Sequence, residues 1–272
     1  MESPSPHSFL VVRRTWLSRR PHFRASLIAA WSVFALIAMS VVYWRNWGGI
    51  GALLPASGEA VFKNHEYWRL WTALFAHADL GHLASNSLGI FVLGYFLSGY
   101  FSLWFFPVAA LLVGGLTNYL TLLSYDPAVK LVGISGVVYW MGAAWLILYL
   151  LLDQQRTKTQ RMLRAFGVAL GVFFPASAFD PSISYLAHWY GFLLGLASGA
   201  VYYFVNRKAF LKALIIEQVV EDSPSEDNLK EPRNVPPEIQ KKKKERGSFW
   251  EPLLLQQHLS LEDNYQLKLD SS

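Results

Sequence analysis

Charged residues are scarce in the middle of the chain, and this scarcity restricts the folds that the chain can adopt. Residues 25–205 contain only eight basic and six acidic residues, whereas 1–24 and 206–272 are rich in charge. Charged residues make up 16% of the whole chain, against about 25% in soluble domains. We therefore expect an all-α membrane domain at 25–205, after a basic N-terminal segment at 1–24 and before a polar, largely disordered tail at 206–272.

Six apolar stretches predict membrane-spanning helices, because a helix needs about 20 apolar residues to cross a bilayer. They lie at about 25–44, 81–100, 103–124, 133–152, 165–179 and 185–205, and the fifth is short and contains Pro175. The long connection between the first two spans is rich in Trp and Tyr. This composition favours a loop that folds onto the membrane interface, with short interfacial helices.

The basic residues predict the orientation in the membrane. With six spans, the N-terminal segment, the loop near 156–164 and the start of the tail lie on one side and carry twelve basic residues, against four on the other. Both termini are therefore expected in the cytoplasm of a multi-pass protein of the cell (inner) membrane. Five arginines directly before an apolar stretch favour this role over nucleic-acid binding. The absence of Cys excludes disulfides, thiolate metal sites and a cysteine nucleophile.

Polar residues within predicted spans are candidate functional groups, because hydrocarbon penalises them. His82 and Asn86 are four residues apart and share one face of the second span. Ser135 stands between Gly133 and Gly136 in a Gly-Ile-Ser-Gly sequence at the start of the fourth. His77 is expected just outside the membrane in a structural role, and Asn118 on the third span is expected as a buried hydrogen-bond partner.

The sixth span carries His188, Gly191 and Gly195 at spacings that place them on one helix face. Small residues on such a face allow a second helix to approach closely. Ser135 and Tyr139 share a face of the fourth span. If the two faces meet, Ser135 comes within reach of His188, and Tyr139 can stack on the imidazole.

A serine beside a neutral histidine predicts nucleophilic catalysis, because the imidazole can accept the hydroxyl proton. Attack on a carbonyl generates an oxyanion, and hydrogen-bond donors directed at it lower the barrier. His82, Asn86 and the backbone N–H of Ser135 are candidate donors.

The arrangement of these motifs resembles that of the rhomboid family of intramembrane serine proteases. The segment around Ser135 matches the family's GxSG, His82 and Asn86 match its HxxxN, and the segment from His188 to Gly195 matches its HxxGxxxG. Trp68-Arg69 matches a Trp-Arg pair in the family's long first loop, although both residues could equally be interfacial anchors. The continuation Val137-Val138-Tyr139 is similar to that of bacterial members.

The resemblance implies a six-transmembrane-helix rhomboid-like bundle with a long interfacial first loop. It implies Ser135 as the nucleophile and His188 as the base of a catalytic dyad, with His82 and Asn86 stabilising the oxyanion and no metal or organic cofactor. The expected supporting residues are Gly133, Gly136, Tyr139, Gly191, Gly195, Trp68 and Arg69.

The sequence departs from the family pattern at the end of the second span. Many members carry an acidic residue there, whereas residues 95–99 contain none. A structural tie of the first loop is therefore expected to be missing or replaced. Phe173 or Phe174 is the expected residue of the lateral gate.

The leading functional hypothesis is an intramembrane serine endopeptidase that hydrolyses peptide bonds in or near transmembrane segments of membrane proteins. Its partners would be transmembrane protein substrates and the lipid bilayer, without nucleic acid. A non-catalytic rhomboid-like protein that binds membrane helices and a rhombosortase-like processor of C-terminal tails remain alternatives. A transporter is disfavoured, because the sequence has no internal repeat.

Overall fold

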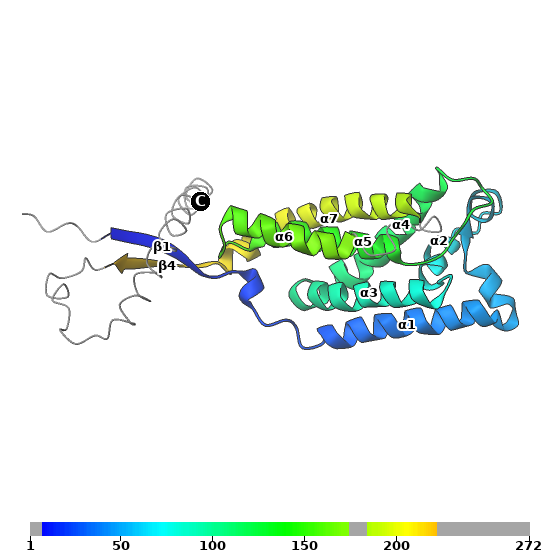
Figure 1. The fold of residues 1–272 in the computed structure, drawn as a ribbon, viewed down its shortest axis with the longest axis horizontal. Coiled ribbons are helices and arrows are strands. Elements are labelled where there is room, and N and C mark those ends of the chain that lie inside the picture. The colour runs from blue at the N-terminus through cyan, green and yellow to red at the C-terminus, as the bar shows by residue number, and fades with distance from the viewer. Residues whose placement is uncertain (1–6, 174–183, 222–272) are drawn as a thin grey trace, which may run out of the picture.

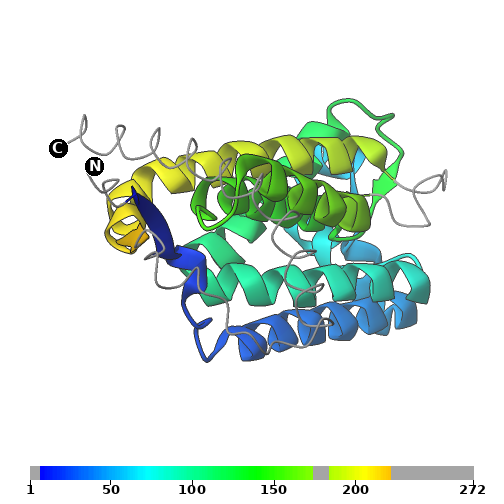
Figure 2. The same ribbon diagram turned by 60° about the vertical axis from the view of Figure 1, so that its left-hand side comes forward.

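The computed structural model describes residues 7–173 and 184–221 and consists mainly of long helices lying side by side (Figure 1). The long helices are α1 (Ala25–Arg45), α3 (Leu80–Tyr100), α4 (Ala110–Leu122), α5 (Ser135–Leu152), α6 (Lys158–Phe173) and α7 (Tyr185–Lys212). α4 directly follows η5 (Trp104–Ala109). Both ribbon views show α1 beside α3, with α6 and α7 on the opposite side of the molecule (Figures 1 and 2). The prediction of a bundle of long helices is confirmed.

Four of the described helices are long and apolar enough to cross a membrane. They are α1, α3, the continuous segment Trp104–Leu122 and α5. The predicted fifth and sixth spans differ more from the structure: α6 begins at Lys158 rather than near 165, and α7 continues to Lys212 rather than ending near 205. The additional turns carry basic residues, so a search for apolar stretches cannot find them. The rest of the predicted fifth span, with Pro175 and Phe174, lies outside the described residues, and the six-span count stays a prediction.

α5 lies at the centre of the bundle and packs against α3, α4, α6 and α7. Trp140, Met141 and Leu148 on α5 are completely buried. α7 approaches α5 closely because it presents glycines there. A methyl group at Gly191 would overlap the carbonyl oxygen of Gly136, and one at Gly195 would overlap the carbonyl oxygen of Trp140. The expected small-residue face is therefore a real packing surface.

The loop between α1 and α3 folds into a small unit with short helices, as expected. It contains η2 (Trp47–Leu53), β2 (Ala56–Ser57), η3 (Glu59–Lys63), α2 (Arg69–Thr72) and η4 (Ala73–Phe75). β2 pairs antiparallel with β3 (Lys130–Leu131), which links the loop to the segment before α5. Val61, Leu70 and Leu122 belong to a separate buried cluster beneath the loop.

A two-stranded antiparallel ribbon joins the two ends of the described chain. β1 (His7–Arg14) pairs with β4 (Ile215–Glu221), and the ribbon extends beyond the helices in Figure 1. The start of the expected polar tail thus continues α7 to Lys212 and forms β4, whereas residues 222–272 lie outside the described residues. Isoleucine and valine favour the strand, but the partner strand is about 200 residues away in the sequence.

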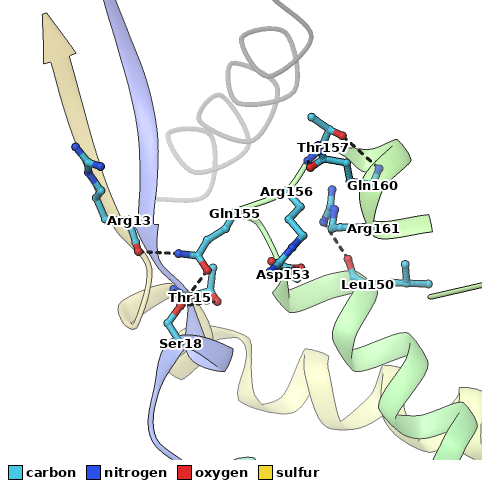
Figure 3. Close-up of polar contacts among 10 residues, drawn as sticks. All are labelled: Arg13, Thr15, Ser18, Leu150, Asp153, Gln155, Arg156, Thr157, Gln160 and Arg161. Atoms are coloured by element: carbon cyan, nitrogen blue, oxygen red, sulfur yellow. Dashed lines mark hydrogen bonds and ion pairs between the residues drawn. The ribbon is translucent and has the colours of Figure 1, made fainter. Parts of the chain in front are cut away.

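Polar contacts connect this ribbon to the α5–α6 loop (Figure 3). Between β1 and α1, η1 (Trp16–Ser18) lies beside that loop. Gln155 donates to the carbonyl oxygen of Arg13 at 2.7 Å and accepts from the hydroxyl of Ser18 at 3.1 Å. Arg156 pairs with Asp153 within the same loop. The chain before α1 is thus fixed to the end of α5.

Candidate active site

Ser135 is the first residue of α5 and is half-buried. Gly133, two residues earlier, has φ +108°, a backbone conformation that side chains rarely adopt. Its N–H donates to the carbonyl oxygen of Ala73 at 2.9 Å, which ties the Gly-Ile-Ser-Gly segment to the end of the first loop. The turn at Gly133 and its hydrogen bond to Ala73 therefore fix the segment that leads into α5, where Ser135 carries its hydroxyl.

His188 lies on the face of α7 that packs against α5. Its imidazole stacks on the ring of Tyr139, with 4.0 Å between the ring centroids and 13° between the planes. The predicted stacking of Tyr139 on His188 is thus confirmed. The Tyr139 hydroxyl donates to the carbonyl oxygen of Phe173 at 3.1 Å, which joins α5 to α6.

Nε2 of His188 is buried and has no hydrogen-bond partner among the described residues, and no hydrogen bond joins it to Ser135. A buried polar atom without a partner is costly. Catalytic hydrogen bonds are often long in a site without substrate and shorten when substrate binds. The geometry leaves Nε2 available to accept a proton near the start of α5.

α3 brings the HxxxN residues to the same region. The imidazole of His82 lies against Gly133, where a methyl group would be 2.5 Å from Cε1 of His82. Asn86, one turn later, is buried, and its Nδ2 has no hydrogen-bond partner in the described part of the chain. Gly89, further along α3, packs against the side chain of Val138. This face of α3 therefore presents His82 and Asn86 toward the beginning of α5.

Ser40 and His77 form a serine–histidine contact next to His82. Ser40 on α1 and His77, which precedes α3, are both completely buried. The hydroxyl of Ser40 lies 2.9 Å from Nδ1 of His77 and 3.1 Å from the carbonyl oxygen of Phe75, to which it donates. Because the hydroxyl proton of Ser40 is used in the bond to Phe75, Nδ1 of His77 must carry a proton and donate it to the Ser40 oxygen. The imidazole of His77 meets that of His82 edge to face, with centroids 5.1 Å apart.

The sequence indicates polar residues at 40 and 77 but not their pairing, because 37 residues separate them. His77 was expected just outside the membrane in a structural role, and it does precede the first residue of α3. Burial, followed by the nearby His82, lowers the pKa of His77 from 6.5 to about 4. Its imidazole is therefore neutral near pH 7.

Arg69 and Trp68 lie in the first loop, and the contacts of the Arg69 side chain hold that loop together. Arg69 is buried, pairs with Glu66, and donates through Nη1 to the carbonyl oxygens of Ala52 and Pro55, both at 3.1 Å. Trp68 is exposed. Arg69 and Glu66, both in the first loop, thus hold the loop together. This agrees with the expectation that the tie between the loop and the second span is missing or replaced.

Two further sequence expectations concern a buried amide and a metal site. Asn118 donates to the carbonyl oxygen of Leu70 at 2.8 Å, as expected for a buried hydrogen-bond partner. Within residues 7–173 and 184–221, no group of three or more His, Asp or Glu side chains is placed to hold a metal ion.

Comparison with known proteins gives two matches. Residues 64–204 match the Rhomboid domain family, and this range contains all the sequence motifs described above. The chain is also similar to a Bacillus subtilis (strain 168) protein named "Putative rhomboid protease YdcA", with 29% identity over 170 residues, or 59% of this chain and 76% of the relative.

Proposed function

The chain belongs to the rhomboid family, and on this premise we propose that it is an intramembrane serine endopeptidase with Ser135 and His188 as its catalytic dyad. The observation that carries the proposal is the buried, unpartnered Nε2 of His188 on a ring fixed by Tyr139. An imidazole held in one orientation beside the start of α5 suits a general base for the Ser135 hydroxyl.

The proposed reaction has two halves. Nε2 of His188 takes the proton of Ser135 as Oγ attacks the substrate carbonyl, and the resulting imidazolium then protonates the leaving amine. Water, deprotonated by the same imidazole, hydrolyses the acyl-enzyme and restores Ser135. The oxyanion receives hydrogen bonds from the backbone N–H of Ser135, His82 and Nδ2 of Asn86, whose lack of another partner supports this role.

The substrates are proposed to be transmembrane segments of other membrane proteins. A helical segment in lipid keeps its carbonyls in internal hydrogen bonds, so the bond to be cut must first leave the helix. Segments that contain helix-destabilising residues are therefore the expected substrates. The excess of basic residues on one side supports cytoplasmic termini in the cell membrane, and a reporter fused after Ser272 tests this orientation.

Cleavage of a transmembrane substrate in liposomes tests the dyad. Ser135→Ala and His188→Ala should each lower kcat at least a thousandfold, because neither variant can generate the nucleophile. Ser40→Ala is the matched control. Ser40 is completely buried, and its proton is engaged by a backbone carbonyl, so this variant should retain activity.

The controls separate the alternative mechanisms. Loss of cleavage in Ser40→Ala with full activity in Ser135→Ala would assign catalysis to the Ser40–His77 pair. A wild-type protein that neither cleaves nor reacts with a fluorophosphonate would contradict the proposal in favour of the non-catalytic helix-binding function. Cleavage confined to C-terminal sorting tails would favour the rhombosortase-like function.

A further inference from the structure

An apolar groove of about 410 Å3 lies between α1 and α4. α1 forms one wall through Leu27, Trp31 and Ala35, and η5 and α4 form another through Pro107 and Leu111. Leu27, Trp31 and Leu111 are also exposed. The groove therefore opens toward the hydrocarbon that would surround these helices.

The interior of the groove offers little to a polar ligand. Ser32 lines it, but its hydroxyl already donates to the carbonyl oxygen of Ile28 at 2.8 Å. Among the described residues that line it, only Arg24 carries a charge. An occupant must therefore be apolar along the groove and can be charged only beside Arg24.

Arg24 lies at the end of the groove where α1 begins. Its guanidinium stands over the ring of Phe23 at 5.1 Å and forms no ion pair with a described residue. Arg19 and Arg20 precede it and are exposed. This end of the groove thus has an excess of positive charge at the level where the apolar helix starts.

The length of the groove and the positive charge at its end fit one acyl chain with an anionic headgroup. The wall residues on α1 extend from Arg24 to Leu36, or about 18 Å along the helix axis. A single acyl chain suits the length, since half of the hydrocarbon core is about 15 Å thick.

We propose that this groove binds one anionic phospholipid, with an acyl chain between α1 and α4 and the phosphate on Arg24. Apolar burial holds the chain, and a basic residue between transmembrane helices is a favourable contact for an anionic headgroup. The proposal does not depend on proteolytic activity.

The inner end of the groove places the lipid next to the candidate active site. Ile134 and Val137, which lie immediately before and two residues after Ser135, line its wall, as does Phe75. The carbonyl oxygen of Phe75 accepts the hydrogen bond from Ser40. The acyl chain therefore supports the back of the segment that carries Ser135.

Native mass spectrometry of the full chain tests the site, with dioleoyl phosphatidylglycerol and dioleoyl phosphatidylcholine as competing lipids. Wild type should retain one phosphatidylglycerol in preference. Arg24→Gln should weaken its retention about fivefold, because one basic contact is lost. Arg207→Gln is the matched control: Arg207 is an exposed arginine at the charged end of α7, away from the groove, and retention should stay unchanged.

Ala35→Trp fills the groove without changing its charge, and it should reduce retention of both lipids at the site. Equal retention by wild type, Arg24→Gln and Ala35→Trp would overturn the proposal. A benzophenone amino acid at position 31 in phosphatidylglycerol vesicles gives a second measurement that does not depend on folding of Ala35→Trp. Crosslinks to phospholipid are expected, whereas crosslinks only to a transmembrane peptide added to the vesicles would assign the groove to a helix instead.

Discussion

At the residue scale, the Ser40–His77 contact and the proposed catalytic residues Ser135 and His188 differ in their surroundings. Ser40 and His77 are completely buried and hydrogen-bonded to each other. Nε2 of His188 has no partner among the described residues, and Ser135 is half-buried at a helix start. The completely buried hydroxyl of Ser40, whose proton is held by the carbonyl oxygen of Phe75, suits a structural contact, whereas the half-buried hydroxyl of Ser135 is more open to a substrate carbonyl.

The pKa of His77 makes the stability of the protein dependent on pH. Because the folded state lowers this pKa to about 4, the unfolded chain binds more protons between about pH 4 and 6.5. The stabilising contribution of neutral His77 is therefore complete above about pH 6.5. It is lost as the pH falls toward 4, by an amount of at most about 3 kcal/mol.

Thermal unfolding in detergent between pH 7.5 and 4.5 measures this effect. Wild type should lose more of its midpoint temperature on acidification than His77→Gln, which cannot titrate at this position. Ser40→Ala keeps the imidazole and should keep the pH dependence. Identical pH profiles for wild type and His77→Gln would contradict the assignment.

At the element scale, the contact between α5 and α7 decides whether the proposed dyad can form. The predicted face of His188, Gly191 and Gly195 requires a partner helix, and the structure identifies it as α5. The motif spacing therefore predicts the packing face correctly. It does not predict that α7 runs on to Lys212, because the basic last turns lack the apolar pattern.

Gly191→Ala tests this packing. The added methyl group would overlap the carbonyl oxygen of Gly136, so the helices must separate, at a cost of about 1–3 kcal/mol. Proteolytic activity should fall together with the unfolding midpoint. The control is Gly171→Ala on α6, where nothing lies within 4 Å of the added methyl group. That variant should unfold at the same temperature or slightly higher, and equal midpoints for both variants would refute the packing argument.

At the scale of the whole molecule, the two ends of the described chain meet in the ribbon of β1 and β4. Gln155 joins this ribbon to the end of α5 through Arg13 and Ser18 (Figure 3). The groove along α1 depends on the same arrangement, since the segment between β1 and α1 carries Arg24. An extramembrane ribbon thus determines where the N-terminal arginines lie relative to the bundle.

Gln155→Ala should loosen the ribbon without unfolding the helices. The loss of two hydrogen bonds, each contributing about 1 kcal/mol, should speed amide hydrogen exchange in β1 by about tenfold or more, with exchange in α5 unchanged. Gln154→Ala removes a neighbouring amide with no hydrogen bond from its side chain in the described chain. Equal exchange in the two variants would show that Gln155 does not hold the ribbon.

The sequence alone determined the membrane class, most helix positions and the faces that carry Ser135, His188, His82 and Asn86. These features depend on local composition and on spacing along one helix, which a linear pattern contains. Only the tertiary structure decided that Ser40 meets His77, that β1 meets β4 and that α1 and α4 enclose a groove. Each of these joins segments far apart in the chain, and such contacts form only after the helices have packed.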